Sequence, residues 1–158
     1  MAMADNAAKL ETPLLADYAL EADAVEGWAT AMVAYFKTMD RLPGTDALID
    51  ALKSPIQVAM GGMSVPGAGA AKLQAGFLAA WVGISGSAAS LYTGATSATP
   101  PTAVATLAAI VLPPVFALNQ VPAITKPQAA TATAGALSGA NATGGFWVLP
   151  GPVTVAIT

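Results

Sequence analysis

The chain has 158 residues, which suits one domain of ordinary size or a compact domain with an extended arm. Charged residues make up only 9% of it, against about 25% in typical soluble domains, while hydrophobic residues make up 55%. Residues 1–50 hold all nine acidic side chains and three of the six basic ones, so their formal charge is −6 and the remainder carries +3. Neither part has the basic density that phosphate backbones require, which argues against nucleic-acid binding.

The N-terminal part is expected to contain an arm and then a helical domain. Residues 1–12 are interpreted as a flexible arm, and they lack the basic and apolar regions of a secretory signal peptide. The helical domain is expected over residues 13–112. Its first helix, at about 13–41, is predicted by apolar residues at steps of three and four, by Thr12 as N-cap and by Pro13 at the first helical position.

A second, shorter helix is expected at about 45–53. Thr45 or Asp46 can cap its start, and Pro55 is expected to stop it. The apolar run at 56–60 fits either a helix or a strand, so its structure stays open.

Two further helices are expected, at about 70–92 and 102–112, with a Gly/Thr/Ser/Pro loop at 93–101 between them. The double proline at 113–114 is expected to end the last helix. One apolar face of the helix at 70–92 is predicted to carry Leu73, Phe77, Ala80, Trp81, Ile84 and Ala88.

Residues 113–158 are predicted to form an Ala/Thr/Pro/Gly-rich extended arm that ends in short strands at 146–149 and 153–157. Pro150-Gly151-Pro152 suits a turn between them, and a hairpin containing Pro152 would lie at a sheet edge. The arm could cross to a neighbouring subunit or pack on its own domain. The side chains predicted to make the inter-subunit contact are Phe146, Trp147, Val148, Leu149, Val153, Val155 and Ile157.

One cluster of carboxylates stands out, formed by Asp17, Glu21, Asp23 and Glu26. Asp17 and Glu21 are four residues apart and share a helix face, so the cluster could hold a cation or do acid–base work. Helical di-metal sites also use histidine, however, and the chain has none. We interpret the cluster as a solvated face that complements the helix dipole, and we expect no metal and no cofactor.

Other catalytic chemistry has little support. Gly67–Lys72 faintly resembles a phosphate loop, but Leu73 follows Lys72 where the motif needs Ser or Thr, so a hinge is the better interpretation. Serine and threonine nucleophiles need a base, and the chain lacks both histidine and a Ser-x-x-Lys motif. Without cysteine there is no thiolate chemistry. We therefore expect that the protein is not an enzyme.

A membrane role is the alternative interpretation. Residues 73–125 are uncharged, and one or two spans could lie at about 73–92 and 103–118. The first of these spans is rich in serine and glycine, and the double proline interrupts the second.

The favoured interpretation is a non-catalytic structural subunit of a large homo-oligomeric assembly, because burial against other copies removes a charge-poor surface from water. The composition is similar to that of bacteriophage virion proteins, namely head completion, head–tail connector, cement or tail components. That similarity implies assembly in the host cytoplasm and partners that are copies of the chain and other structural proteins.

Overall fold

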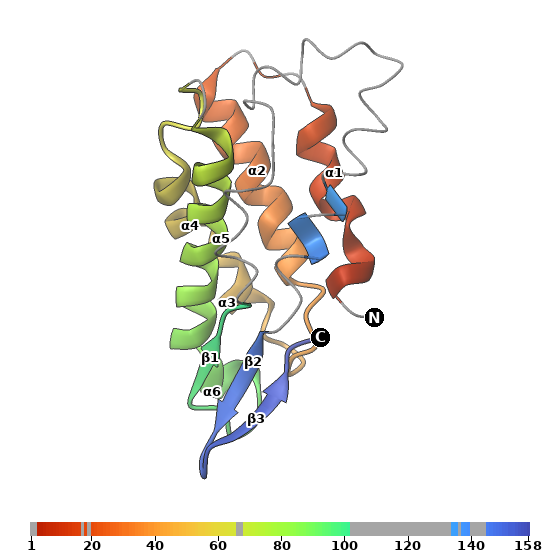
Figure 1. The fold of residues 1–158 in the computed structure, drawn as a ribbon, viewed down its shortest axis with the longest axis vertical. Helices are drawn as coiled ribbons and strands as arrows, with labels where there is room; N and C mark the ends of the chain where they lie inside the picture. The colour runs from red at the N-terminus through yellow and green to blue at the C-terminus, as the bar shows by residue number, and fades with distance from the viewer. Residues whose placement is uncertain are drawn as a thin grey trace.

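The structure is a computed structural model. It describes residues 3–16, 18, 20–65, 68–101, 134–135, 137–139 and 145–158. A mainly helical N-terminal region is followed by a C-terminal stretch with a three-stranded antiparallel sheet, which confirms the predicted fold class (Figure 1). The elements in chain order are η1 (Met3–Asn6), α1 (Ala8–Leu15), α2 (Glu21–Phe36), α3 (Asp46–Asp50), α4 (Lys53–Met60), α5 (Gly69–Gly86), α6 (Ala88–Leu91), β1 (Ser97–Thr99), β2 (Phe146–Leu149) and β3 (Val153–Ala156).

The helix predicted at 13–41 is in fact two helices, α1 and α2, with α1 beginning before Pro13. The backbones of Ala16 and Leu20 are extended, so the chain turns between the helices. α1 then packs against α2 and buries Leu10 and Leu14, which lie one turn apart. One continuous helix could not make this contact, and the buried leucines offset the hydrogen bond that Pro13 removes from α1.

The second helix also differs from its prediction at 45–53. α3 is a short helix, and α4 begins at Lys53 and continues through Pro55. Pro55 is the third residue of α4, where its missing N–H would have had no intrahelical partner, so it does not stop the helix. The ambiguous run at 56–60 is therefore helical, and it buries Ile56 and Met60.

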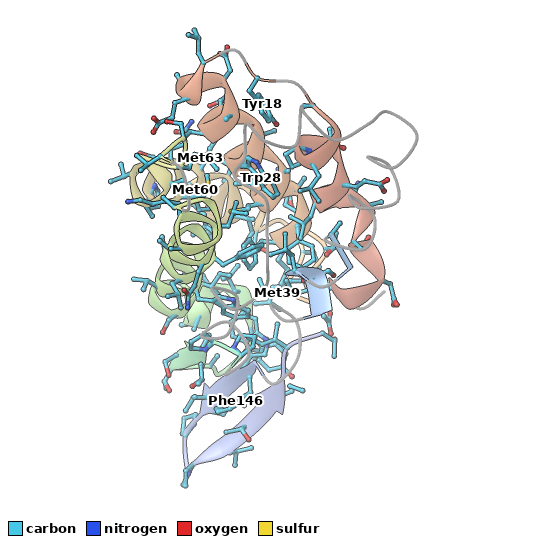
Figure 2. The ribbon with its side chains drawn as sticks, turned by 45° about the horizontal axis from the view of Figure 1, so that its top comes forward. Tyr18, Trp28, Met39, Met60, Met63 and Phe146 are labelled. Carbon is cyan, nitrogen blue, oxygen red and sulfur yellow. The ribbon has the colours of Figure 1, made fainter. Side chains whose placement is uncertain are left out.

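α5 and α6 together replace the helix predicted at 70–92, with Ser87 between them. The whole predicted apolar face of this segment is buried. Phe77 of α5 lies edge-on to Tyr35 and Phe36 of α2, with ring centroids 6.3 and 5.9 Å apart, and Trp81 lies 5.9 Å from Phe36. This aromatic cluster joins α5 to α2. Figure 2 labels two other buried side chains of the core, Trp28 on α2 and Met60 at the end of α4.

The sheet has the strand order β1-β2-β3. β2 has the predicted bounds and β3 ends one residue early, while Gly151, at φ +82°, makes the turn between them. β1 lies in the segment predicted as a loop, so that prediction was wrong at residues 97–99. Its pairing partner is about fifty positions away in the chain, and Ser-Ala-Thr alone carries no strand signal.

A single hydrophobic core includes both ends of the described chain. Met3 of η1 is fully buried, although residues 1–12 were predicted to be a flexible arm, and its N–H donates to the Thr158 carbonyl at 2.6 Å. Leu137, Trp147 and Ile157, from the predicted C-terminal arm, belong to the same core as the helices. The helix predicted at 102–112 lies outside the described residues.

Candidate interaction surfaces

Glu21, from the acidic cluster, fastens the first turn of α2 to the chain between α4 and α5. Its carboxylate accepts hydrogen bonds from the Ser64 hydroxyl, at 2.5 Å, and from the Gly62 N–H. These bonds, together with the nearby charge of Lys72, lower the pKa of Glu21 below its ordinary value. Glu21 thus stabilises the chain at residues 62–64. The hinge predicted at 67–72 differs in the structure, because residues 69–72 are the first turn of α5.

Glu26, one turn further along α2, makes a second bridge. It accepts hydrogen bonds from Lys53 and Gln57 of α4, and the bond from Lys53 is the main cause of its lowered pKa. A general acid needs a raised pKa, which is the opposite direction. Among the described residues no group of three or more potential acidic, histidine or cysteine ligands could hold a metal ion. Asp17 lies outside the described part, and Asp23 is exposed.

A hollow of about 570 Å³ lies beside Arg41, where α2 gives way to α3. The Arg41 guanidinium already donates to the Thr45 hydroxyl, at 2.6 Å, and pairs with Asp46. Asp40 also lines the hollow. An anionic ligand would have to displace Asp46 and approach Asp40, so these charges do not make an anion site.

The residues predicted to contact a neighbouring subunit divide into three groups by exposure: buried, half-buried and exposed. Trp147 and Ile157 are buried in this chain's own core, and Trp147 stacks on Tyr92 with ring centroids 5.5 Å apart. Val153 is 51% exposed. The half-buried members are Phe146, Val148, Leu149 and Val155. Figure 2 shows Phe146 on the sheet.

An apolar groove of about 470 Å³ lies between α5 and β1. Leu78 and Val82 form its helical side, and they are 38% and 74% exposed. Trp81, Ala98 and Pro100 also line it. Sequence reasoning missed this groove because β1 was not predicted. Leu78 and Val82 lie one turn apart on a second apolar face of α5, which was the available signal.

The two walls of the groove, on α5 and β1, carry no charged side chain. Apart from Lys126, the sequence has no acidic or basic residue after Lys72. Almost all of α5 and the entire sheet are therefore uncharged, and in Figure 1 the sheet extends beyond one end of the helices. The ion pairs Lys37–Asp50, Arg41–Asp46 and Lys53–Glu26 come from α2, the segment that follows it, α3 and α4. Asp40 and Arg41 approach the sheet, because they line a hollow with Leu149 of β2.

Comparisons of the chain with protein-family models, with curated proteins and with solved structures find no match. Over the described residues, no helix combines the length and the hydropathy needed to cross a bilayer. The predicted span at 103–118 is outside the described part. The functional argument therefore rests on the charge distribution and the surfaces of this chain.

Proposed function

We propose that the chain is a non-catalytic structural subunit of a large homo-oligomeric assembly, of the kind that builds bacteriophage particles. The observation that carries this proposal is the uncharged, partly apolar surface of the sheet and of α5 after Lys72. Solvent-exposed apolar grooves without nearby charge are typical of surfaces that bind other proteins. The phage setting is supported by the charge-poor, Ala/Thr/Pro/Gly-rich composition.

The energetics favour burial of this surface in an assembly. Moving a Val or Leu side chain from full exposure to full burial contributes roughly 1.5–3 kcal/mol, so Val82, at 74% exposure, gains most of this and Leu78, at 38%, a smaller part. Val82 and Leu78 lie beside each other on α5, so one contact would cover both. No charged side chain of α5 after Lys72 would have to be desolvated when that contact forms.

The carboxylates with shifted pKa values support a structural role. Glu21 and Glu26 hold α2 against α4 and the chain that follows it, and both pKa values are lowered by hydrogen bonds. Such carboxylates stay ionised and hydrogen-bonded at neutral pH, which suits a contact that holds two helices together better than proton transfer.

A pair of valine substitutions tests the proposal. Val82→Lys places a charge in the groove, whereas Val58→Lys changes a valine of similar exposure, 80%, on α4, the helix that carries Lys53. We expect the wild type and Val58→Lys to form large particles by light scattering and negative-stain microscopy. Val82→Lys should weaken association at least about tenfold, the effect of about 1.4 kcal/mol, with unchanged circular dichroism.

Three results would contradict the proposal. A wild type that stays monomeric at high concentration would exclude self-assembly. Equal assembly of both lysine variants would exclude the groove as the contact. Recovery of the wild type only from membranes with detergent would favour the alternative membrane interpretation.

A further inference from the structure

The backbone hydrogen bonds between β3 and β2 determine which residues of β3 point their N–H and C=O groups away from the sheet. The Ile157 N–H donates to the Gly145 carbonyl at 2.9 Å, and the register pairs Val155 with Trp147 and Val153 with Leu149. Backbone groups alternate in direction along an antiparallel strand. Val153, Val155 and Ile157 therefore point their N–H and C=O groups towards β2, and the residues between them point outwards.

An independent contact agrees with this alternation. Thr158, like Thr154 and Ala156, is expected to point its backbone groups away from β2, and its carbonyl accepts a hydrogen bond from Met3 on that outer side. Thr154 and Ala156 are both exposed, and their outward N–H and C=O groups have no hydrogen bond to any described residue. The outer edge of β3 is thus closed at Thr158 and open at Thr154 and Ala156.

The opposite edge of the sheet is protected differently. β1 packs against α5, and the Ala98 N–H donates to the Ser85 hydroxyl of that helix at 3.3 Å. β3 has no such cover and no charged residue or internal proline, and its short length of four residues is the one feature it shares with edge strands that avoid pairing with other chains. The sheet therefore has one covered edge and one edge ready for another strand.

We propose that β3 pairs with β3 of a second copy of the chain, antiparallel and across a two-fold axis at Val155. Thr154 of each copy then lies opposite Ala156 of the other, and four N–H···O=C hydrogen bonds form. The two sheets become one six-stranded sheet. This inference rests on the proposed function and identifies one contact through which the copies join.

The unpaired backbone groups of Thr154 and Ala156 favour this register over the two neighbouring ones. With the axis at Thr154, Ala156 would face Pro152, which has no N–H to donate. With the axis at Ala156, Thr154 would face Thr158, whose carbonyl is already bonded to Met3. Only the axis at Val155 matches both open residues with open residues.

The strand is also complementary to itself in side-chain chemistry. No charge would face a like charge across the axis, because β3 carries none. Val155 would lie beside Val155 of the second copy, on the same face as Trp147, and β-branched pairs of this kind stabilise neighbouring strands. These features favour a second copy as the occupant of the edge.

Engineered cysteines test the register directly, since the chain has no cysteine of its own. Residues opposite each other in a non-hydrogen-bonded pair have Cα atoms about 4.5 Å apart, within the range of a disulfide. Val155→Cys should therefore form a covalent dimer under mild oxidation on a non-reducing gel. Val153→Cys is the matched control, because its symmetry mate would be displaced by four residues, about 13 Å along the strand.

The more exposed position, Val153, should thus cross-link less. Equal cross-linking of the two variants would indicate random collision and overturn the proposal. An assembled wild type in which Val155→Cys does not cross-link would also overturn it.

A proline substitution tests the hydrogen bonds. Thr154→Pro removes an N–H that points away from β2, a position at which edge strands tolerate proline, and Thr154→Val keeps the N–H. Two of the four intermolecular bonds are lost by symmetry, so the dissociation constant of the pair should rise at least roughly thirtyfold by analytical ultracentrifugation. Unchanged association of a folded Thr154→Pro chain would exclude the pairing, and if this variant unfolds the cysteine pair decides.

The outcomes separate this inference from the proposed function. Large wild-type particles without the Val155 cross-link would leave the assembly role intact and remove β3 as its contact. A cross-linked Val155→Cys pair with a wild type that never exceeds a dimer would support the β3 contact and contradict a large assembly.

Discussion

At the scale of single residues, the Tyr35 hydroxyl connects distant parts of the core. It donates to the Ser138 carbonyl at 2.9 Å, and the Ser138 hydroxyl lies 3.2 Å from the Met3 carbonyl. Tyr35→Phe leaves a buried carbonyl without this donor, so we expect the free energy of unfolding to fall by about 1–3 kcal/mol in urea titrations. Tyr92→Phe is the control: it keeps the stack on Trp147, and a change within about 0.5 kcal/mol is expected. Equal changes in the free energy of unfolding for Tyr35→Phe and Tyr92→Phe would show that the buried hydrogen bond to Ser138 does not stabilise the fold.

Glu21 leads to a prediction about how the free energy of unfolding depends on pH. Its folded-state pKa lies below the ordinary value of 4.5, so the unfolded chain binds the proton more readily. The stability that ionised Glu21 contributes is therefore complete above the unfolded pKa and is lost as pH falls through the folded one. Glu21→Gln should be less stable than wild type at neutral pH, with the difference shrinking as the pH falls below 4.5 in urea titrations. Asp23→Asn changes an exposed carboxylate on the same helix and is the control, with an expected change within about 0.5 kcal/mol at neutral pH.

At the scale of elements, two glycines of α5 differ in their surroundings. A Cβ on Gly83 would lie 2.3 Å from Leu52, whereas a Cβ on Gly86 would meet nothing within 4 Å. Gly86→Ala should raise the free energy of unfolding by up to about 1 kcal/mol through helix propensity. Gly83→Ala should lose that gain and be destabilised by roughly 1–3 kcal/mol, because Leu52 must move. Thermal melts that rank Gly83→Ala at or above Gly86→Ala would show that Leu52 repacks freely.

The success of the helix predictions depended on how local their signals were. α5 was predicted well because its buried face repeats every three to four residues along one segment. The break before α2 and the start of α1 were missed, because they depend on helix–helix packing. The groove between α5 and β1 could not be predicted either, since its second wall exists only when β2 pairs with β1.

At the scale of the whole molecule, the C-terminal hairpin completes the core of the helices. Removing residues 145–158 would delete Trp147 and Ile157 from that core and leave β1 unpaired. We expect the truncated chain to lose cooperative thermal unfolding and part of its helical circular dichroism. Val153→Ala, which trims an exposed side chain of the same hairpin, should stay within about 0.5 kcal/mol of wild type. A truncated chain that melts as the wild type does would show that the helices fold independently.

The sequence by itself determined the mainly helical class, the two C-terminal strands with their Pro-Gly-Pro turn, and the absence of charged side chains from the sheet and from α5 after Lys72. These features are local or compositional, so they need no knowledge of what packs where. Only the tertiary structure decided that Glu21 clasps Gly62, that Trp147 enters the core and that the outer edge of β3 is open. Each depends on residues far apart in the chain, whose proximity comes from burying one shared core rather than from any pattern within a segment.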